Sequence, residues 1–269
     1  MQLPIHIIDA FTSEQFKGNQ AAVVPLQSWL SDAVLQAIAA ENNLSETAFL
    51  VWSSEQQAFE IRWFSPLTEI DFCGHATLAS AFVLFEEGVV PASEPVCFWA
   101  KAVGMLTARR EASGRICMTF PRRDAQPLQE PPAALRAALQ PAPEQWLVNQ
   151  QAYMAVYADE ATVRALQPDM DLLRTLGPLD VVVTAPGDAG AGYDFASRYF
   201  WPANGGDEDP VTGSIHAALA PYWAQRLGKP QLTALQASRR SGWLFCTVDA
   251  NSVQVAGDCV RYLRGEISL

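Results

Sequence analysis

Hydrophobic positions along the chain follow two patterns, short runs typical of strands and longer segments with helical spacing. A 3.6-residue apolar period predicts a helix over residues 32–41, with Ser31 as its amino-terminal cap, and a more apolar helix is predicted over 76–86. Runs rich in Ile, Val and aromatic residues predict strands at 5–11, 47–52, 59–64, 151–157 and 179–184. The pattern is that of a mixed α and β chain.

An internal repeat is the strongest feature of this pattern. Residues 62–66 (RWFSP) recur as 198–202 (RYFWP), an offset of 198 − 62 = 136. Gly104 begins a segment that is echoed from Gly242, an offset of 242 − 104 = 138. Because two distant anchors have nearly the same offset, the sequence predicts two similarly folded halves with a cleft between them.

Prolines mark the predicted boundary between the halves. Six prolines lie in the segment from Pro121 to Pro143, both included, and leave only a short helical piece at 133–139. We therefore expect an amino-terminal domain of residues 1–120 and a carboxy-terminal domain of residues 121–269.

Composition restricts the partners of such a protein. The 269 residues are 49% hydrophobic, and 18 Lys and Arg against 29 Asp and Glu give a net charge of −11, which disfavours nucleic acid and anionic lipid. The longest apolar run, 76–85, is too short to span a membrane, and the amino terminus resembles no signal peptide. Five cysteines without a Cys-x-x-Cys pair fit reduced thiols. We expect a soluble, cytoplasmic protein.

Small residues open a predicted helix in each half, at Gly74-His75 and at Thr212-Gly213-Ser214. A helix amino terminus offers unpaired N–H groups and the positive end of the helix dipole, so both openings suit a carboxylate. The alternative is that they are ordinary helix caps in which glycine serves packing. The first interpretation predicts a small anionic substrate, such as an amino acid or a cyclic carboxylic acid.

Several side chains are candidates for moving a proton. Glu46 opens an apolar strand, a setting that suits acid–base catalysis, although a solvated charge at a strand end is the alternative. The acidic residues 207–209 precede the second helix opening and also suit a helix dipole. His75 lies at a helix start, where it could donate to a substrate. Cys73 beside it is either a stabilised thiolate or a buried structural thiol.

No metal site is predicted, because His6, His75 and His216 lack the spacing of metal ligands.

At these residues the chain resembles the PhzF-like family, named for phenazine biosynthesis, which shares its fold with diaminopimelate epimerase. The matching segments are 9–11 (DAF), 18–19 (GN), 43–47 (NLSET), 73–77 (CGHAT) and 208–214 (EDPVTGS). The resemblance implies an α+β protein with two similar domains, each a curved, mostly antiparallel sheet wrapped around a central helix. It also implies an active site between the domains, catalysis without cofactor or metal, and a homodimer.

The resemblance also implies roles for particular residues. Glu46 would be the general acid/base, and His75 and Asp209 would assist proton movement. Substrate contacts would come from these residues: Asn19, Gly74, Thr212, Gly213 and Ser214. The expected reaction is an isomerisation that moves a proton within a small carboxylic or cyclic amino acid.

Two alternatives remain. One is an epimerase or racemase that uses Cys73 with a carboxylate, although the relatives with that chemistry have paired cysteines and here Asp209-Pro210 stand at the matching place. The other is a binding protein without turnover, because a fold is often retained while its chemistry changes.

Overall fold

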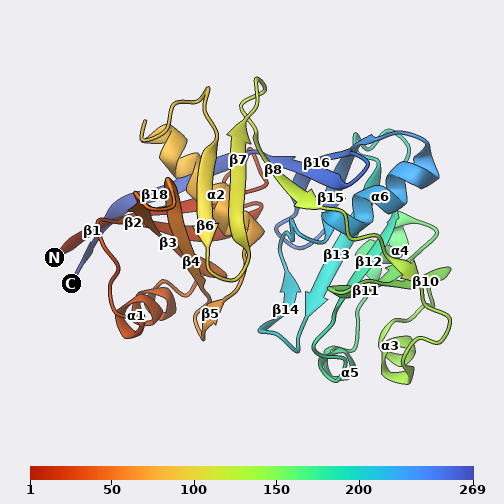
Figure 1. Cartoon of the computed structure of the whole chain (residues 1–269). Helices are drawn as coiled ribbons and strands as arrows, with labels where there is room; N and C mark the ends of the chain where they lie inside the picture. Colours follow the sequence, from red (N-terminus) through yellow and green to blue (C-terminus); the bar gives the residue numbers. More distant parts are fainter. The chain divides into compact units, whose positions relative to one another are not determined.

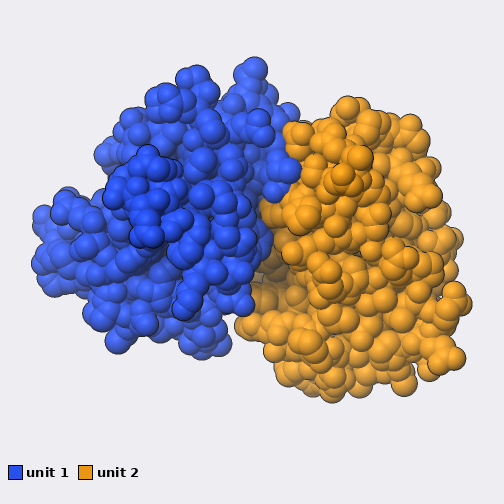
Figure 2. Space-filling model, viewed as in Figure 1, with its two compact units in different colours: residues 1–119, 256–269 blue, residues 120–255 orange.

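The computed structural model describes all 269 residues and divides into two compact units (Figure 2). Unit 1 contains residues 1–119 and 256–269, and unit 2 contains residues 120–255. The sequence placed 256–269 in the second domain, whereas strand β18 (Cys259–Ser268) pairs antiparallel along strand β1 (Gln2–Ala10). Backbone hydrogen bonds between the two ends of the chain therefore make unit 1 discontinuous.

Unit 1 contains most of the predicted strands of the first half and two helices (Figure 1). Between its terminal strands it has, in chain order, β2 (Asn19–Leu26), α1 (Asp32–Asn42), β3 (Glu46–Ser53), β4 (Ala58–Phe64), β5 (Glu69–Ile70), α2 (Gly74–Glu86), β6 (Val96–Ala100), β7 (Gly104–Arg110) and β8 (Ile116–Pro121), whose end crosses into unit 2. Most neighbouring strands are antiparallel, but β2 pairs parallel with β3, and β4 with β6.

Two helices pack against the sheet of unit 1. Helix α2 is apolar on nearly all sides and contacts β1, β2, β3, β7 and β18, so it is the central helix of this unit. Helix α1 contacts β3 and β4, and its Leu35 and Ile38 pack with Phe49 and Phe64. Ser31 precedes α1 as predicted, but its side chain makes no capping hydrogen bond.

Unit 2 is also a mixed sheet with helices. It contains β9 (Gln126–Pro127), α3 (Ala133–Ala138), β10 (Gln145–Val148), β11 (Ala152–Val156), α4 (Glu160–Ala165), α5 (Met170–Arg174), β12 (Asp180–Pro186), β13 (Phe195–Trp201), β14 (Gly206–Asp209), α6 (His216–Leu227), β15 (Gln231–Gln236) and β16 (Gly242–Val248) (Figure 1). Strand β17 (Ser252–Gly257) leads back into unit 1. Helix α6 packs on β15 and β16, and its Trp223 donates to Thr184 of β12 and stacks on Phe195 of β13.

The two units repeat one strand pattern, as the sequence predicted. In unit 1 a parallel β2–β3 pair is followed by antiparallel β4 and then by parallel β6. In unit 2 a parallel β11–β12 pair is followed by antiparallel β13 and then by parallel β15. Glu46 and Asp180 are the first residues of the corresponding strands β3 and β12. The internal repeat is thus a repeat of topology.

No helix of the chain has both the length and the apolar character needed to cross a bilayer.

Candidate active site

Four polar residues lie together in unit 1, near the starts of β2, β3 and α2: Asn19, Glu46, Cys73 and His75. Helix α1 ends at Asn42, its C-cap Asn43 turns the chain with a left-handed φ of 49°, and Glu46 follows as the first residue of β3. Glu46 is buried, and its side chain is 6% exposed. The solvated strand-end interpretation of Glu46 is therefore wrong.

Glu46 lies against His75 near the start of helix α2. Its Oε2 is 2.9 Å from Nε2 of the buried His75, although this oxygen makes no well-directed hydrogen bond. Burial alone lowers the pKa of His75, but the neighbouring Cys73 and Glu46 raise it above its ordinary value. The pair therefore holds a proton donor beside a carboxylate that water scarcely reaches.

The other nitrogen of His75 contacts a fixed amide. Asn19 Nδ2 lies 3.2 Å from His75 Nδ1, and Ser45 donates to Asn19 Oδ1 at 3.1 Å. Asn19 is placed by Gly18, whose φ is 64° and where an added Cβ would lie 2.1 Å from the carbonyl oxygen of Ala10. Ser45 and Asn19 therefore orient the His75 ring.

Cys73 precedes helix α2 and is also buried. Its Sγ lies 3.4 Å from His75 Nδ1, and its carbonyl accepts hydrogen bonds from the amide and hydroxyl of Thr77. Burial, with a smaller contribution from Glu46, raises the pKa of Cys73 to about 11. The thiol form is therefore favoured at neutral pH, which agrees with the buried-thiol alternative for Cys73.

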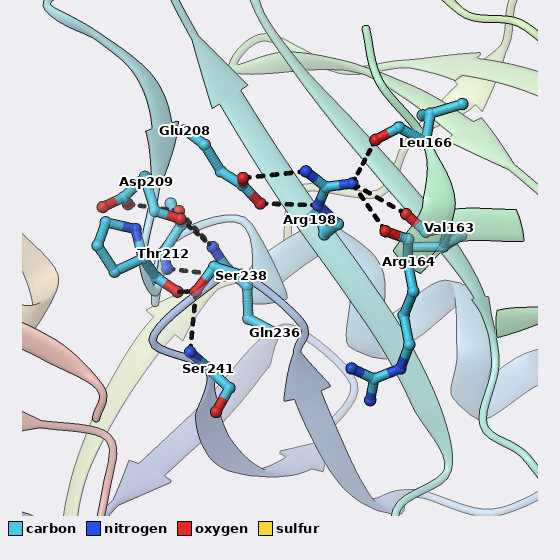
Figure 3. Close-up of polar contacts among 11 residues, drawn as sticks. Val163, Arg164, Leu166, Arg198, Glu208, Asp209, Thr212, Gln236, Ser238 and Ser241 are labelled. Carbon is cyan, nitrogen blue, oxygen red and sulfur yellow. Dashed lines mark hydrogen bonds and ion pairs between the residues drawn. The ribbon is translucent and has the colours of Figure 1, made fainter. Parts of the chain in front are cut away.

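In unit 2, a glutamine holds the loop that carries Asp209. Asp209 ends β14, and its Oδ2 accepts a hydrogen bond from the hydroxyl of Thr212 at 2.5 Å. The buried Gln236 donates to the Asp209 carbonyl at 2.8 Å and contacts the Thr212 hydroxyl at 3.3 Å, and its Oε1 accepts from the Thr212 amide at 2.8 Å (Figure 3). Its side chain therefore fixes both ends of this loop.

Ser214 belongs to a second polar network in unit 2. Gln151 donates to the Ser214 hydroxyl at 2.9 Å and to the Tyr199 hydroxyl at 3.1 Å, and Tyr199 donates to Asp180 at 2.6 Å. Burial raises the pKa of Asp180, although Tyr199 partly offsets this effect. Asp180, at the strand position that corresponds to Glu46, is thus hydrogen-bonded within unit 2.

The repeated arginine is structural in both units. Arg62 pairs with both oxygens of Glu69 at 2.7 and 2.6 Å. Arg198 pairs with both oxygens of Glu208 at 2.8 and 3.0 Å. Arg198 also donates to carbonyls at the end of helix α4, including that of Leu166 at 2.7 Å (Figure 3). Each arginine joins its strand to the next one, and Glu208 directly precedes Asp209.

The second helix opening differs from the first. Gly74 is the first residue of α2, as predicted within two residues. Helix α6 begins at His216, so Thr212, Gly213 and Ser214 lie in the turn before it. There the amide of His216 bonds to the Gly213 carbonyl at 3.2 Å. The sequence therefore located the opening, although the polar groups offered there belong to a turn.

Most predicted site residues lie together within their own unit. Glu46, His75, Asn19 and Cys73 form one cluster in unit 1, and Asp209 and Thr212 form another in unit 2. Sequence reasoning missed the residues that hold these clusters, namely Ser45, Gln151, Gln236 and, as a hydrogen-bonding group, Tyr199. Only Ser45 and Tyr199 lay in segments that the motifs had marked.

Comparisons with known proteins agree with this architecture. A family model described as phenazine biosynthesis-like protein (PhzC-PhzF) matches residues 8–265. An uncharacterized isomerase of Pseudomonas aeruginosa is 44% identical over 269 residues, 100% of both chains. The crystal structure of a PhzF-family protein from Enterococcus faecalis is 41% identical, with a TM-score of 0.93 and 100% of both chains covered.

More distant structures show the same fold. A predicted epimerase of Pseudomonas aeruginosa is 22% identical, with a TM-score of 0.73 over 98% of this chain and 99% of its own. The expected epimerase-like α+β fold is thus confirmed. Together with the whole-chain matches to proteins named isomerases, these findings show that the chain is an enzyme that belongs to the phenazine biosynthesis-like (PhzC-PhzF) isomerase family.

Proposed function

We propose that this chain catalyses a proton shift within a small carboxylic or cyclic amino acid, with Glu46 as general acid/base and without a cofactor. The observation that carries the proposal is the buried contact of Glu46 Oε2 with His75 Nε2 at 2.9 Å. A carboxylate removed from water and held beside a proton donor can accept a proton from carbon and return it elsewhere.

The proposed step breaks one C–H bond of the substrate and forms another. Glu46 takes the proton, and the electron pair moves into a neighbouring unsaturated or carbonyl group. The same carboxyl group then returns the proton to a different carbon, so the substrate and product have equal composition. His75, oriented by Asn19, donates a hydrogen bond to the charge that develops.

Asp209 and Ser214 are proposed to serve the same reaction, as the resemblance implies. These roles are supported by the hydrogen bonds that hold both residues in place within unit 2. Thr212 and Gln236 fix the loop of Asp209, and Gln151 holds the Ser214 hydroxyl. We further propose that the backbone amides of Gly74 and Gly213 bind the substrate carboxylate. A homodimer in the cytoplasm is the expected physiological form.

Deuterium incorporation tests the role of Glu46. Candidate unsaturated cyclic amino acids and related carboxylic acids are incubated in heavy water with wild type, with Glu46→Gln, and with Glu41→Gln as the exposed control. We expect Glu46→Gln to lose about 10²- to 10⁴-fold of the exchange rate, and the control to retain it. Equal incorporation by wild type and Glu46→Gln would remove Glu46 from the mechanism.

Epimerisation through Cys73 is the second candidate, because the Cys73 thiol lies 3.4 Å from His75. The pKa of Cys73, about 11, disfavours a thiolate base at neutral pH. The variant Cys73→Ala separates the two reactions: an isomerase keeps a substantial turnover, whereas an epimerase that needs the thiol loses it. Inversion at a stereocentre by wild type, abolished in Cys73→Ala, would establish the epimerase.

A further inference from the structure

Three different metal-ligand atoms lie together in unit 1. A carboxylate oxygen of Glu46, the sulfur of Cys73 and a ring nitrogen of His75 are all within 4.8 Å of one another, and the three residues are buried. Glu46 and the 73–75 segment come from different elements, β3 and the start of α2. The spacing of these residues in the sequence therefore does not predict the cluster, which forms only in the folded chain.

This set of atoms matches the ligands that zinc prefers. Thiolate, imidazole and carboxylate are zinc ligands, and sites with three protein ligands leave one position open. In a tetrahedral site the ligand atoms lie roughly 3.3–3.6 Å apart. Here His75 Nε2 is 3.9 Å from Cys73 Sγ and 2.9 Å from Glu46 Oε2. Because Cys73 Sγ lies nearer to Nδ1, at 3.4 Å, a shared cation at Nε2 requires the Cys73 side chain to rotate toward Glu46.

The carboxylate oxygen of Glu46 that faces His75 is incompletely satisfied. Glu46 Oε2 is buried and makes no well-directed hydrogen bond, even though it faces His75. Its polar partner is His75 Nε2 at 2.9 Å, and a misaligned donor satisfies a buried carboxylate oxygen only in part. A cation between Glu46, Cys73 and His75 would complete the interactions of this oxygen.

The surroundings of His75 also suit a metal-binding histidine. A histidine that binds metal through one nitrogen normally bonds through the other to a fixed polar group. Asn19 occupies this place at 3.2 Å from Nδ1 and is itself held by Ser45. Because an amide can present either its oxygen or its nitrogen, Asn19 can accept a proton from Nδ1 while Ser45 bonds to the amide nitrogen.

We propose that Glu46, Cys73 and His75 form a binding site for a thiophilic divalent cation, with Zn²⁺ as its representative. Cys73 binds as the thiolate and its proton passes to solvent. Occupation of the site withdraws Glu46 and His75 from proton transfer, so the cation inhibits the enzyme. The inhibition rests on the proposed function, whereas the binding does not.

Binding is tested on the full-length protein with Co²⁺, whose absorption reports a bound thiolate. Wild type is expected to show a thiolate-to-cobalt band that stoichiometric Zn²⁺ removes. Cys73→Ser is expected to lose the band, and Glu46→Gln to bind Co²⁺ at least about 10-fold more weakly. Cys97→Ser, which changes a more exposed thiol of the same unit, is expected to keep the band.

The outcomes separate the two proposals. A wild-type protein without the band, or a Cys73→Ser protein that keeps it, overturns the metal site. Circular dichroism and the thermal transition identify variants that fail to fold. If Cys73→Ser fails to fold, Asn19→Leu provides the second test, because it is expected to weaken Co²⁺ binding about 10- to 100-fold. If the band is present but no candidate acid exchanges deuterium, the binding site stands and the proposed function fails.

Discussion

The carboxylate of Glu46 and the imidazole of His75 form a buried contact, with Oε2 2.9 Å from Nε2. They come from different elements, the start of strand β3 and the start of helix α2. The geometry of this pair depends on the residues that hold the histidine ring, and the order of the Asp209 loop depends on Gln236. Substitutions of these supporting residues therefore test how the reacting groups are held.

Asn19→Leu is expected to reduce kcat about 10- to 100-fold, because the ring of His75 loses the amide that orients it. Asn42→Leu, which removes an amide that donates to the Thr47 hydroxyl near the start of β3, is the matched control. Steady-state kinetics with the substrate found by deuterium exchange provide the measurement. A fall in the control as large as in Asn19→Leu would indicate a general loss of structure.

Gln236→Met is expected to lower kcat about 10-fold or more, because the loop from Asp209 to Thr212 loses its side-chain bonds. The Thr212 amide is expected to exchange faster with solvent. Gln231→Met changes an exposed residue of the same strand and serves as the control.

A pair of changes at Thr212 checks the same loop. Thr212→Ser keeps the hydroxyl that bonds to Asp209 and is expected to retain most activity, whereas Thr212→Val removes it. Equal activity of the two variants would mean that the hydroxyl does not position Asp209.

The repeated arginines are expected to differ in their effect on stability. Arg198→Leu leaves Glu208 and the carbonyls at the end of α4 without their partner, and breaking such a half-buried pair costs about 3 kcal/mol. Arg62→Leu breaks a more exposed pair with Glu69 and costs about 1 kcal/mol. Urea unfolding of both variants measures the difference, and equal losses would contradict this assignment.

His216 is expected to make the free energy of unfolding depend on pH. Burial lowers the pKa of His216 to about 4, and its Nδ1 bonds to the Thr212 carbonyl. The unfolded chain binds a proton near pH 6.5 and the folded chain only near pH 4, so stability falls as pH drops through this window. The loss is about 3 kcal/mol at most.

The variant His216→Phe isolates this contribution. Its unfolding free energy is expected to fall less steeply between pH 6.5 and 4 than that of wild type. The pKa of His6 is also lowered by burial, so part of the dependence remains in the variant. Identical slopes for the two proteins would show that His216 is protonated equally in the folded and unfolded chains.

Local sequence determined the elements and the repeat. Apolar periodicity placed α1 and the strand that carries Glu46, and the recurring Arg-aromatic segment marked β4 and β13 as equivalent strands. These features depend on neighbours in the chain and on burial of one face, so they can be read without coordinates. The family motifs located Glu46, His75 and Asp209 in the same way.

Only the tertiary structure decided which atoms meet. Histidine spacing gave no metal ligands, yet folding brings Glu46 against Cys73 and His75, because a carboxylate on one element and a ring on another meet only when β3 and α2 pack. Gln236 carries no motif, and its role exists only because β15 ends beside the Asp209 loop. Pairing of β18 with β1 joined the two chain ends in one unit, because strands that are far apart in the sequence can form backbone hydrogen bonds once the chain has folded.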